Sequence, residues 1–329
     1  MALLGAVVYV FAAALRAEPA PPPQAPVVLS RGYPLTVEEP GGRKVVIAAQ
    51  PERILPADSS TADILAALVE PRRMVAVPAT ADSFAGAREF FARHPEIPRF
   101  QQFQAETLLA LKPDLVLAVV FRDNATVDQL EQRGVPVLKF EHFRDFAGIR
   151  GSFMAVGLAV GEGEKAQALA EDFDRRLAAV ARAVAGRPRP RALFYSRYDQ
   201  GFAVGTGESQ DEVLRRAGAR NAAAELNLVG HVRFTLEQML TLKPDYIVVG
   251  GDRGLDSPQA RIVLSEPILA ELPAVKERRI AVVPDRYATS VSQYVVDAVE
   301  ILARQLHSDA FPQSSIRNPQ SAIGGPQAR

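Results

Sequence analysis

Arginine and aromatic residues stand just after several apolar runs of the sequence, and they carry its clearest binding chemistry. Guanidinium groups present planar forks to carboxylate, phosphate or catecholate oxygens, and aromatic faces cover flat apolar parts of a ligand. A tyrosine phenolate could also ligate ferric iron, because an anionic oxygen donor suits a hard cation. We therefore expect a site for a large, flat or anionic metal chelate. The residues predicted to contact it are Ser59, Phe121, Arg122, Tyr195, Arg197, Tyr198, Arg253, Arg286 and Tyr287.

Residue patterns typical of catalysis are absent from the sequence. It contains no cysteine, which excludes disulfides, thiolate metal ligands, a cysteine nucleophile and a lipidated cysteine near the N-terminus. Its four histidines show no HExxH spacing, and neither GxSxG nor a Walker A motif is present. We expect no enzyme, no cofactor and no metal held by the protein alone. The alternative from another class is a two-lobed α/β enzyme, such as a chelatase or a nucleotide-sugar transferase.

A duplicated block must position the binding residues. Residues 106–114 follow the pattern ExxxxLKPD and lead into an apolar run, and residues 237–245 repeat both features. Apolar residues at helical spacing predict a short helix in each copy, which Pro113 or Pro244 must end. The residue before proline favours extended geometry, and the apolar run is typical of a parallel strand covered on both faces. Two copies predict an α/β fold with two similar doubly wound lobes and mostly parallel sheets.

The loops that follow the predicted strands are expected to form the site, because ligands of doubly wound sheets bind beyond the carboxyl ends of the strands. Two lobes that face each other would place these loops on either side of a cleft. Any one of the arginines could instead form a surface ion pair, and any one of the tyrosines could pack at the rim. The loops are residues 58–60, 78–80 and 121–122 in the first lobe, and 195–198, 250–253 and 285–287 in the second.

Composition divides the chain into five parts. Residues 1–26 contain an apolar run and a proline-rich spacer, and the run is shorter than the ~20 residues of a membrane span. This is typical of a signal peptide, although the usual basic start is missing, so we expect export and a start codon assigned late. An uncleaved membrane anchor is the alternative. We predict lobes at 27–143 and 187–308, a helical region at 144–186 between them, and a disordered tail at 309–329.

Local patterns refine this outline. Residues 33–37 and 44–47 predict a hairpin, and Asp58-Ser59-Ser60-Thr61 offers N-cap residues for a helix at 63–68. Thr235 with Gln238 forms a capping-box pattern at the second copy of the block. Between the lobes, the helical spacing in 162–185 predicts one long helix of roughly 35 Å that bridges them.

The opening hairpin, Pro51-Glu-Arg-Ile, the paired ExxxxLKPD blocks and the long inter-lobe helix resemble the periplasmic binding proteins for cobalamin and ferric siderophores. These are the class III substrate-binding proteins of ABC importers, and the resemblance covers roughly residues 33–306. It implies a solute-binding component that captures a ferric siderophore and delivers it to a membrane permease driven by an ATPase. Cobalamin or haem are the alternative ligands in the same role.

The resemblance also implies where the permease docks. By motif position, the docking glutamates of the family fall on Glu106 and Glu237. The alternative is that both acids only stabilise helix N-termini. We further expect a monomer in the periplasm or otherwise outside the cytoplasm. Because 38 basic and 38 acidic residues cancel, we expect no nucleic-acid partner.

Overall fold

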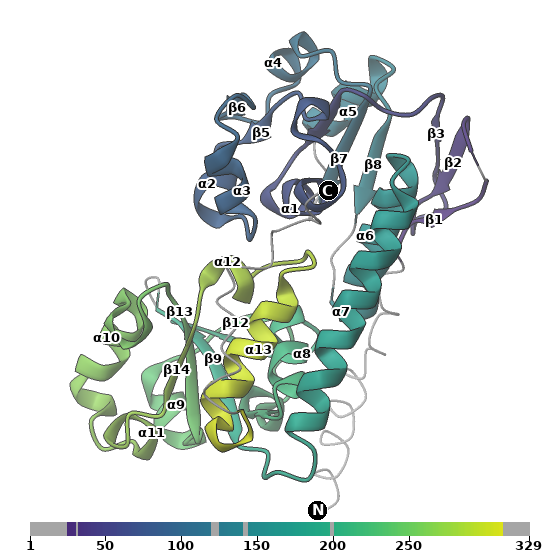
Figure 1. Ribbon diagram of the computed structural model, residues 1–329. Helices are drawn as coiled ribbons and strands as arrows, with labels where there is room; N and C mark the ends of the chain where they lie inside the picture. Colours follow the sequence, from purple (N-terminus) through teal and green to yellow (C-terminus); the bar gives the residue numbers. More distant parts are fainter. Residues whose placement is uncertain (1–24, 31, 120–124, 141–143, 198–200, 312–329) are drawn as a thin grey trace, which may run out of the picture.

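The protein folds into two α/β lobes joined by a helical strut (Figure 1), which confirms the predicted fold class. A computed structural model describes residues 25–30, 32–119, 125–140, 144–197 and 201–311. A small antiparallel sheet precedes lobe 1, and its second and third strands form the predicted hairpin. Its strands are β1 (Val27–Val28), β2 (Leu35–Glu38) and β3 (Lys44–Ile47).

Lobe 1 is built on parallel strands. The order β4-β7-β8 is parallel throughout, and β5 pairs in parallel with β6. A parallel bridge between Ile54 and Met74 joins β4 to the chain just before β5, so the lobe is wound in both directions from β4. The strands are β4 (Ile54–Pro56), β5 (Val77–Pro78), β6 (Arg99–Phe100), β7 (Leu115–Val119) and β8 (Val137–Phe140).

Helices connect and cover these strands. The first begins at Ser59, four residues before the predicted start. Its N-cap is Asp58, one of the four predicted candidates, whose side chain accepts hydrogen bonds from two backbone N–H groups. The helices of lobe 1 are α1 (Ser59–Leu68), η1 (Pro71–Arg73), α2 (Ala81–Phe84), α3 (Arg88–Arg93), α4 (Ala105–Ala110) and α5 (Ala125–Gln132).

Lobe 2 repeats part of this plan. Its strands β9, β13 and β14 are parallel, but β10 and β12 run antiparallel, so the order is β12-β10-β9-β13-β14 with β11 beside β9. Only five residues separate β9 from β10, too few for the crossover that a parallel neighbour requires. The strands are β9 (Arg191–Ser196), β10 (Phe202–Val204), β11 (Arg220–Asn221), β12 (His231–Arg233), β13 (Tyr246–Gly250) and β14 (Ile280–Val283).

The helices of lobe 2 include the predicted capping box at Thr235 and Gln238, which opens α9. They are α8 (Ser209–Arg216), η2 (Ala222–Leu226), α9 (Leu236–Leu242), η3 (Gly254–Asp256), α10 (Pro258–Ser265), η4 (Pro267–Leu269), α11 (Pro273–Lys276), α12 (Asp285–Ala288), α13 (Val295–Leu306) and η5 (Ser308–Ala310).

The strut consists of α6 (Phe146–Ala159) and α7 (Gly163–Ala183), which pack side by side. A Cβ at Gly157 of α6 would lie 2.2 Å from the Cβ of Ala166, so this close approach requires glycine. At 21 residues, α7 spans about 30 Å. Its first turn contacts lobe 1, where Lys165 Nζ donates to the carbonyl of Leu68, and its second half packs on α13 of lobe 2. One helix therefore bridges the lobes, as predicted.

In lobe 1 the helix α4 ends within the ExxxxLKPD block, and its C-terminus is capped. Lys112 adopts a left-handed φ of +48° after α4, and the guanidinium of Arg53 donates to the carbonyl oxygens of Leu111 at 2.6 Å and Lys112 at 2.9 Å. The Asp114 carboxylate then accepts the backbone N–H of Arg53 at 2.9 Å. The acid of LKPD therefore ties the end of the helix to the start of β4.

Lobe 2 contains the same arrangement. Lys243 has a φ of +47°, and the Arg191 guanidinium donates to the carbonyl oxygens of Leu242 at 2.8 Å and Lys243 at 2.7 Å. The Asp245 carboxylate accepts the backbone N–H of Arg191 at 2.7 Å. The duplication seen in the sequence is thus a duplicated structure with the same hydrogen bonds.

Candidate ligand-binding site between the lobes

The loops at the carboxyl ends of the strands face one another across the two lobes. In Figure 1, α1 and α2 lie on the side of lobe 1 nearest lobe 2, and α12 lies on the side of lobe 2 nearest lobe 1. An ion pair of 3.6 Å joins Arg88 of α3 to Asp252, which follows β13. The expected site therefore lies in the region where a ligand of a two-lobed fold would be held.

Arg286 and Tyr287, both predicted to contact the ligand, are adjacent on α12. The Arg286 guanidinium pairs with Asp252 and lies 4.4 Å from the centroid of the Tyr287 ring, a cation–π contact. The Tyr287 ring is buried and stacks on Tyr294, with centroids 6.2 Å apart. Burial raises the pKa of Tyr287, so its phenol is protonated at neutral pH. The predicted phenolate would need a bound metal to lose that proton.

The residues at the end of β9 and directly after it are only partly open to a ligand. The Arg197 guanidinium pairs with Glu266, and its backbone N–H donates to Gln259 Oε1 at 2.8 Å. Tyr195 is buried, and its hydroxyl has no hydrogen-bond partner within the described ranges. Burial also raises the pKa of this phenol. Tyr195 therefore packs inside lobe 2 and offers little of its side chain to a ligand.

The remaining predicted contacts differ in position. Ser59 begins α1, and its Oγ lies 3.0 Å from Thr80 Oγ1, so the loops after β4 and β5 meet there. The Arg253 side chain is exposed. Three predicted contacts, Phe121, Arg122 and Tyr198, lie outside the described residues.

Acidic residues of the same loops were missed by the sequence reasoning. Asp252 and Asp285 precede the predicted Arg253 and Arg286 directly in the sequence. This position was the feature from which they could have been predicted as part of the site. Burial raises the pKa of Asp285, and the neighbouring charge of Asp252 adds to this rise. A Cβ at Gly250 would lie 1.7 Å from Asp285 Oδ1, so glycine is required where β13 meets this acid. The loops of lobe 2 therefore carry opposite charges in close pairs.

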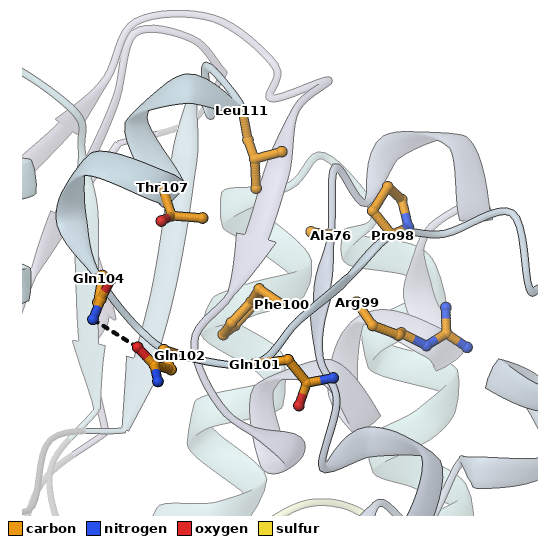
Figure 2. Close-up of a pocket in the computed structure, with 9 residues that line it drawn as sticks. All are labelled: Ala76, Pro98, Arg99, Phe100, Gln101, Gln102, Gln104, Thr107 and Leu111. Atoms are coloured by element: carbon orange, nitrogen blue, oxygen red, sulfur yellow. Dashed lines mark hydrogen bonds between the residues drawn. The ribbon is translucent and has the colours of Figure 1, made fainter.

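A separate pocket of about 340 Å³ lies in lobe 1 between β6 and α4 (Figure 2). Phe100 and Leu111 form part of its apolar wall, and Gln102 and Gln104 are joined at its edge by a 2.7 Å hydrogen bond. None of the predicted ligand contacts lines this pocket. It borders the helix that carries Glu106 and does not belong to the inter-lobe site.

The two predicted docking acids are exposed and occupy the first turns of α4 and α9. The pKa of Glu237 is lowered, first by its own backbone N–H and then by the hydroxyl of Thr235. Figure 1 shows both helices away from the contact between the lobes. A permease and a ligand could therefore bind at separate surfaces.

Within the described ranges, no three histidine, aspartate or glutamate side chains gather closely enough to hold a metal ion. In the same part of the chain, no helix combines the length and the apolar character that crossing a membrane requires.

Known proteins resemble this chain over most of its length. A profile of the periplasmic binding protein family matches residues 55–287. An uncharacterized ABC transporter substrate-binding lipoprotein of Bacillus subtilis is 27% identical over 289 residues, covering 85% of this chain and 88% of the relative. A cobalamin-binding protein of Halobacterium salinarum is 24% identical over 294 residues, covering 88% of this chain and 79% of the relative.

Solved structures give the same result. The periplasmic heme-binding protein RhuT from Roseiflexus sp. RS-1, in its apo form, has a TM-score of 0.65 at 25% identity, covering 79% of this chain and 99% of that structure. One of these relatives is named as a substrate-binding protein of a transporter, and the other two are named as binding proteins for cobalamin and heme. The predicted resemblance is confirmed: the chain belongs to the periplasmic binding protein family, as the solute-binding component of an ABC importer.

Proposed function

We propose that the protein captures a tetrapyrrole metal chelate, haem or a corrinoid, between its lobes. The observation that carries this proposal is that carboxylates already neutralise two of the predicted guanidinium groups. Arg286 pairs with Asp252, and Arg197 pairs with Glu266. A polyanionic ligand would have to compete with these carboxylates, whereas a flat ligand of low charge gains mainly from aromatic and apolar contact. The names of the cobalamin-binding and heme-binding relatives support this class.

A ferric siderophore, our first expectation from the sequence, is the second candidate. It is favoured by Arg253, whose exposed side chain has no ion-pair partner within the described ranges. One free guanidinium could bind a carboxylate or catecholate oxygen of such a ligand. The two candidates therefore differ in how much charge the ligand brings.

Delivery would use the two duplicated acids. We propose that Glu106 and Glu237 bind basic residues of the permease, one from each lobe, while the partner ATPase supplies the energy. Both acids are exposed and belong to the duplicated block, so the two lobes present matching contacts. We place the protein outside the cytoplasm, where such a permease accepts its substrate.

Titration of ligand-free protein with haem, cobalamin and a ferric catecholate siderophore tests the ligand class. Binding of the tetrapyrroles is read from their absorbance, and siderophore binding from tyrosine fluorescence, since the chain has seven tyrosines and no tryptophan. We expect saturable binding of haem or cobalamin, tighter than that of the siderophore. Asp252→Asn, which frees Arg286, should tighten binding of the more strongly anionic siderophore more than it tightens tetrapyrrole binding. Tighter binding of the siderophore by the unmodified protein would overturn the proposal.

A further inference from the structure

A buried carboxylate of lobe 1 holds a segment of lobe 2. Asp63 of α1 is 2% exposed, and its Oδ2 accepts the hydroxyl of Ser292 at 3.0 Å. The Gln293 side chain donates from Nε2 to the backbone carbonyl of Asp63 at 2.7 Å. Ser292 is fully buried, and Ser290 Oγ lies 2.8 Å from its hydroxyl. These contacts join the lobes directly, without the strut.

Lobe 1 holds the same carboxylate from its other side. The backbone N–H of Gly86 donates to Asp63 Oδ2 at 3.0 Å, and that of Ala87 donates to Oδ1 at 2.8 Å. A Cβ at Gly86 would lie 2.4 Å from Cγ of Tyr294, so the tyrosine ring of lobe 2 packs on this turn. Asp63 is thus enclosed by both lobes, and separating them would remove the cover that Ser292, Gln293 and Tyr294 provide.

The enclosed carboxylate lacks a compensating charge. Within the described ranges, the groups that bind its oxygens are the neutral donors Gly86, Ala87 and Ser292, and an ionised carboxylate buried without a cation is costly. Burial therefore raises the pKa of Asp63 from 3.8 to about 7, against the hydrogen bonds from Ala87, Gly86 and Ser292. The nearby acid Asp58 adds to the rise.

We propose that Asp63, Ser292 and Gln293 form a proton-sensitive latch that controls how far the two lobes open. With its proton, Asp63 is neutral and the closed arrangement buries no charge. Without it, the carboxylate gains hydration when Ser292 and Tyr294 move away. The closed arrangement holds the proton at pH values between the ordinary carboxyl pKa and about 7, so opening releases a proton and is favoured as the pH rises.

Other titratable groups lie on the elements packed around the latch. Asp58 caps α1, and burial raises its pKa as well. Tyr294 precedes α13, and burial raises the pKa of its phenol, which keeps it neutral near pH 7. The remaining charged or titratable groups on α3, α12 and α13 are Arg88, Glu89, Arg93, Asp285, Arg286, Tyr287, Asp297, Glu300 and Arg304. Variants must therefore separate Asp63 from Asp58.

Spin labels on the two lobes can measure the opening, because the chain has no cysteine of its own. Ser83→Cys in α2 and Ser265→Cys in α10 are exposed positions on lobe 1 and lobe 2. Pulsed electron paramagnetic resonance on the ligand-free protein then gives the distance distribution from pH 5.5 to 8.5. If opening restores an ordinary carboxyl pKa, the ratio of open to closed protein should rise by up to about tenfold between pH 6 and 8.

Three variants make the test specific. Asp63→Asn should remove the pH dependence, Asp58→Asn should keep it, and Ser292→Ala should lengthen the distances at pH 6. Ser152→Ala is the matched control, because this fully buried serine donates only within α6. A distribution that does not change with pH, or one that titrates unchanged in Asp63→Asn, would overturn the latch. No ligand is needed, so the outcome is independent of the proposed ligand class.

Discussion

At the scale of single residues, arginines form more of the structural contacts than the sequence predicted. Of the arginines predicted to contact ligand, Arg197 and Arg286 are bound to carboxylates of their own lobe. Arg53 and Arg191, which carried no functional prediction, cap the helices of the duplicated block. Residue type alone does not distinguish these roles, because the deciding partner is distant in the sequence.

The helix-capping arginines lead to a prediction about stability. Arg191→Ala should lower the free energy of unfolding by about 2 kcal/mol, because it also removes the ion pair with the Glu225 carboxylate. Arg53→Ala, at an exposed position, should cost about 1 kcal/mol or less. Urea unfolding measures both. Arg261→Ala, which removes an exposed pair with Asp256, is the control and should change little. Equal losses for all three variants would contradict the duplicated cap.

At the scale of helices and strands, α4 and α9 occupy equivalent places in the two lobes, and this equivalence leads to the docking prediction. Reversing both acids, Glu106→Lys with Glu237→Lys, should leave ligand affinity unchanged and abolish stimulation of the permease ATPase. Both acids are exposed, so placing a positive charge at the two helix N-termini should lower the stability of the protein only slightly. ATPase assays with the reconstituted importer measure the effect.

A control for this reversal exists on the strut. Glu164→Lys reverses an exposed acid in the first turn of α7 and should leave ATPase stimulation intact. If the double reversal loses ligand binding instead, the assignment of α4 and α9 to docking is wrong. Loss of stimulation in the Glu164 variant as well would show a general charge effect.

The sequence predicted elements that local chemistry specifies. Pro113 and Pro244 end helices, the Thr235 and Gln238 pair caps one, and the hairpin before lobe 1 forms as expected. The strand β10 was predicted but its antiparallel direction was not, because the direction of a strand depends on its partner. Asp63 was missed for a similar reason: its contact with Ser292 spans 229 positions and leaves no local pattern.

At the scale of the whole molecule, buried polar groups tie the strut to each lobe. The Arg73 guanidinium of lobe 1 donates to the carbonyl of Val160 at 2.7 Å and pairs with Glu162 at 2.9 Å. Arg176 of α7 forms a 2.9 Å hydrogen bond to Asp297 and two of 2.9 Å to Glu300, both on α13. The strut is therefore fixed at both ends, and the Asp63 latch acts between the lobes independently of it.

Removing the second tie should give a pH-dependent loss of stability. Arg176→Met leaves Asp297 and Glu300 without their cation and should cost about 3 kcal/mol at pH 7.5. Burial already raises the pKa of Asp297, with Arg176 opposing the rise, so the variant raises it further. A carboxyl whose pKa is raised in the folded state makes the protein less stable as the pH rises. The stability lost through Arg176→Met should therefore become smaller toward pH 5. Thermal unfolding across this range measures it, and a deficit independent of pH would contradict the assignment.

The segment that reaches lobe 1, residues 290–294, lies close to the end of the described chain. Since a polypeptide is synthesised from its N-terminus, lobe 1 can acquire its fold long before this segment exists. During that interval Ser292 and Tyr294 do not cover Asp63, so the latch that we propose predicts an ordinary carboxyl pKa for Asp63 in the newly made lobe. In the latch that we propose, closing the joint is therefore coupled to proton uptake by Asp63 at pH values below about 7, and a chain that ends before residue 290 would lack this coupling.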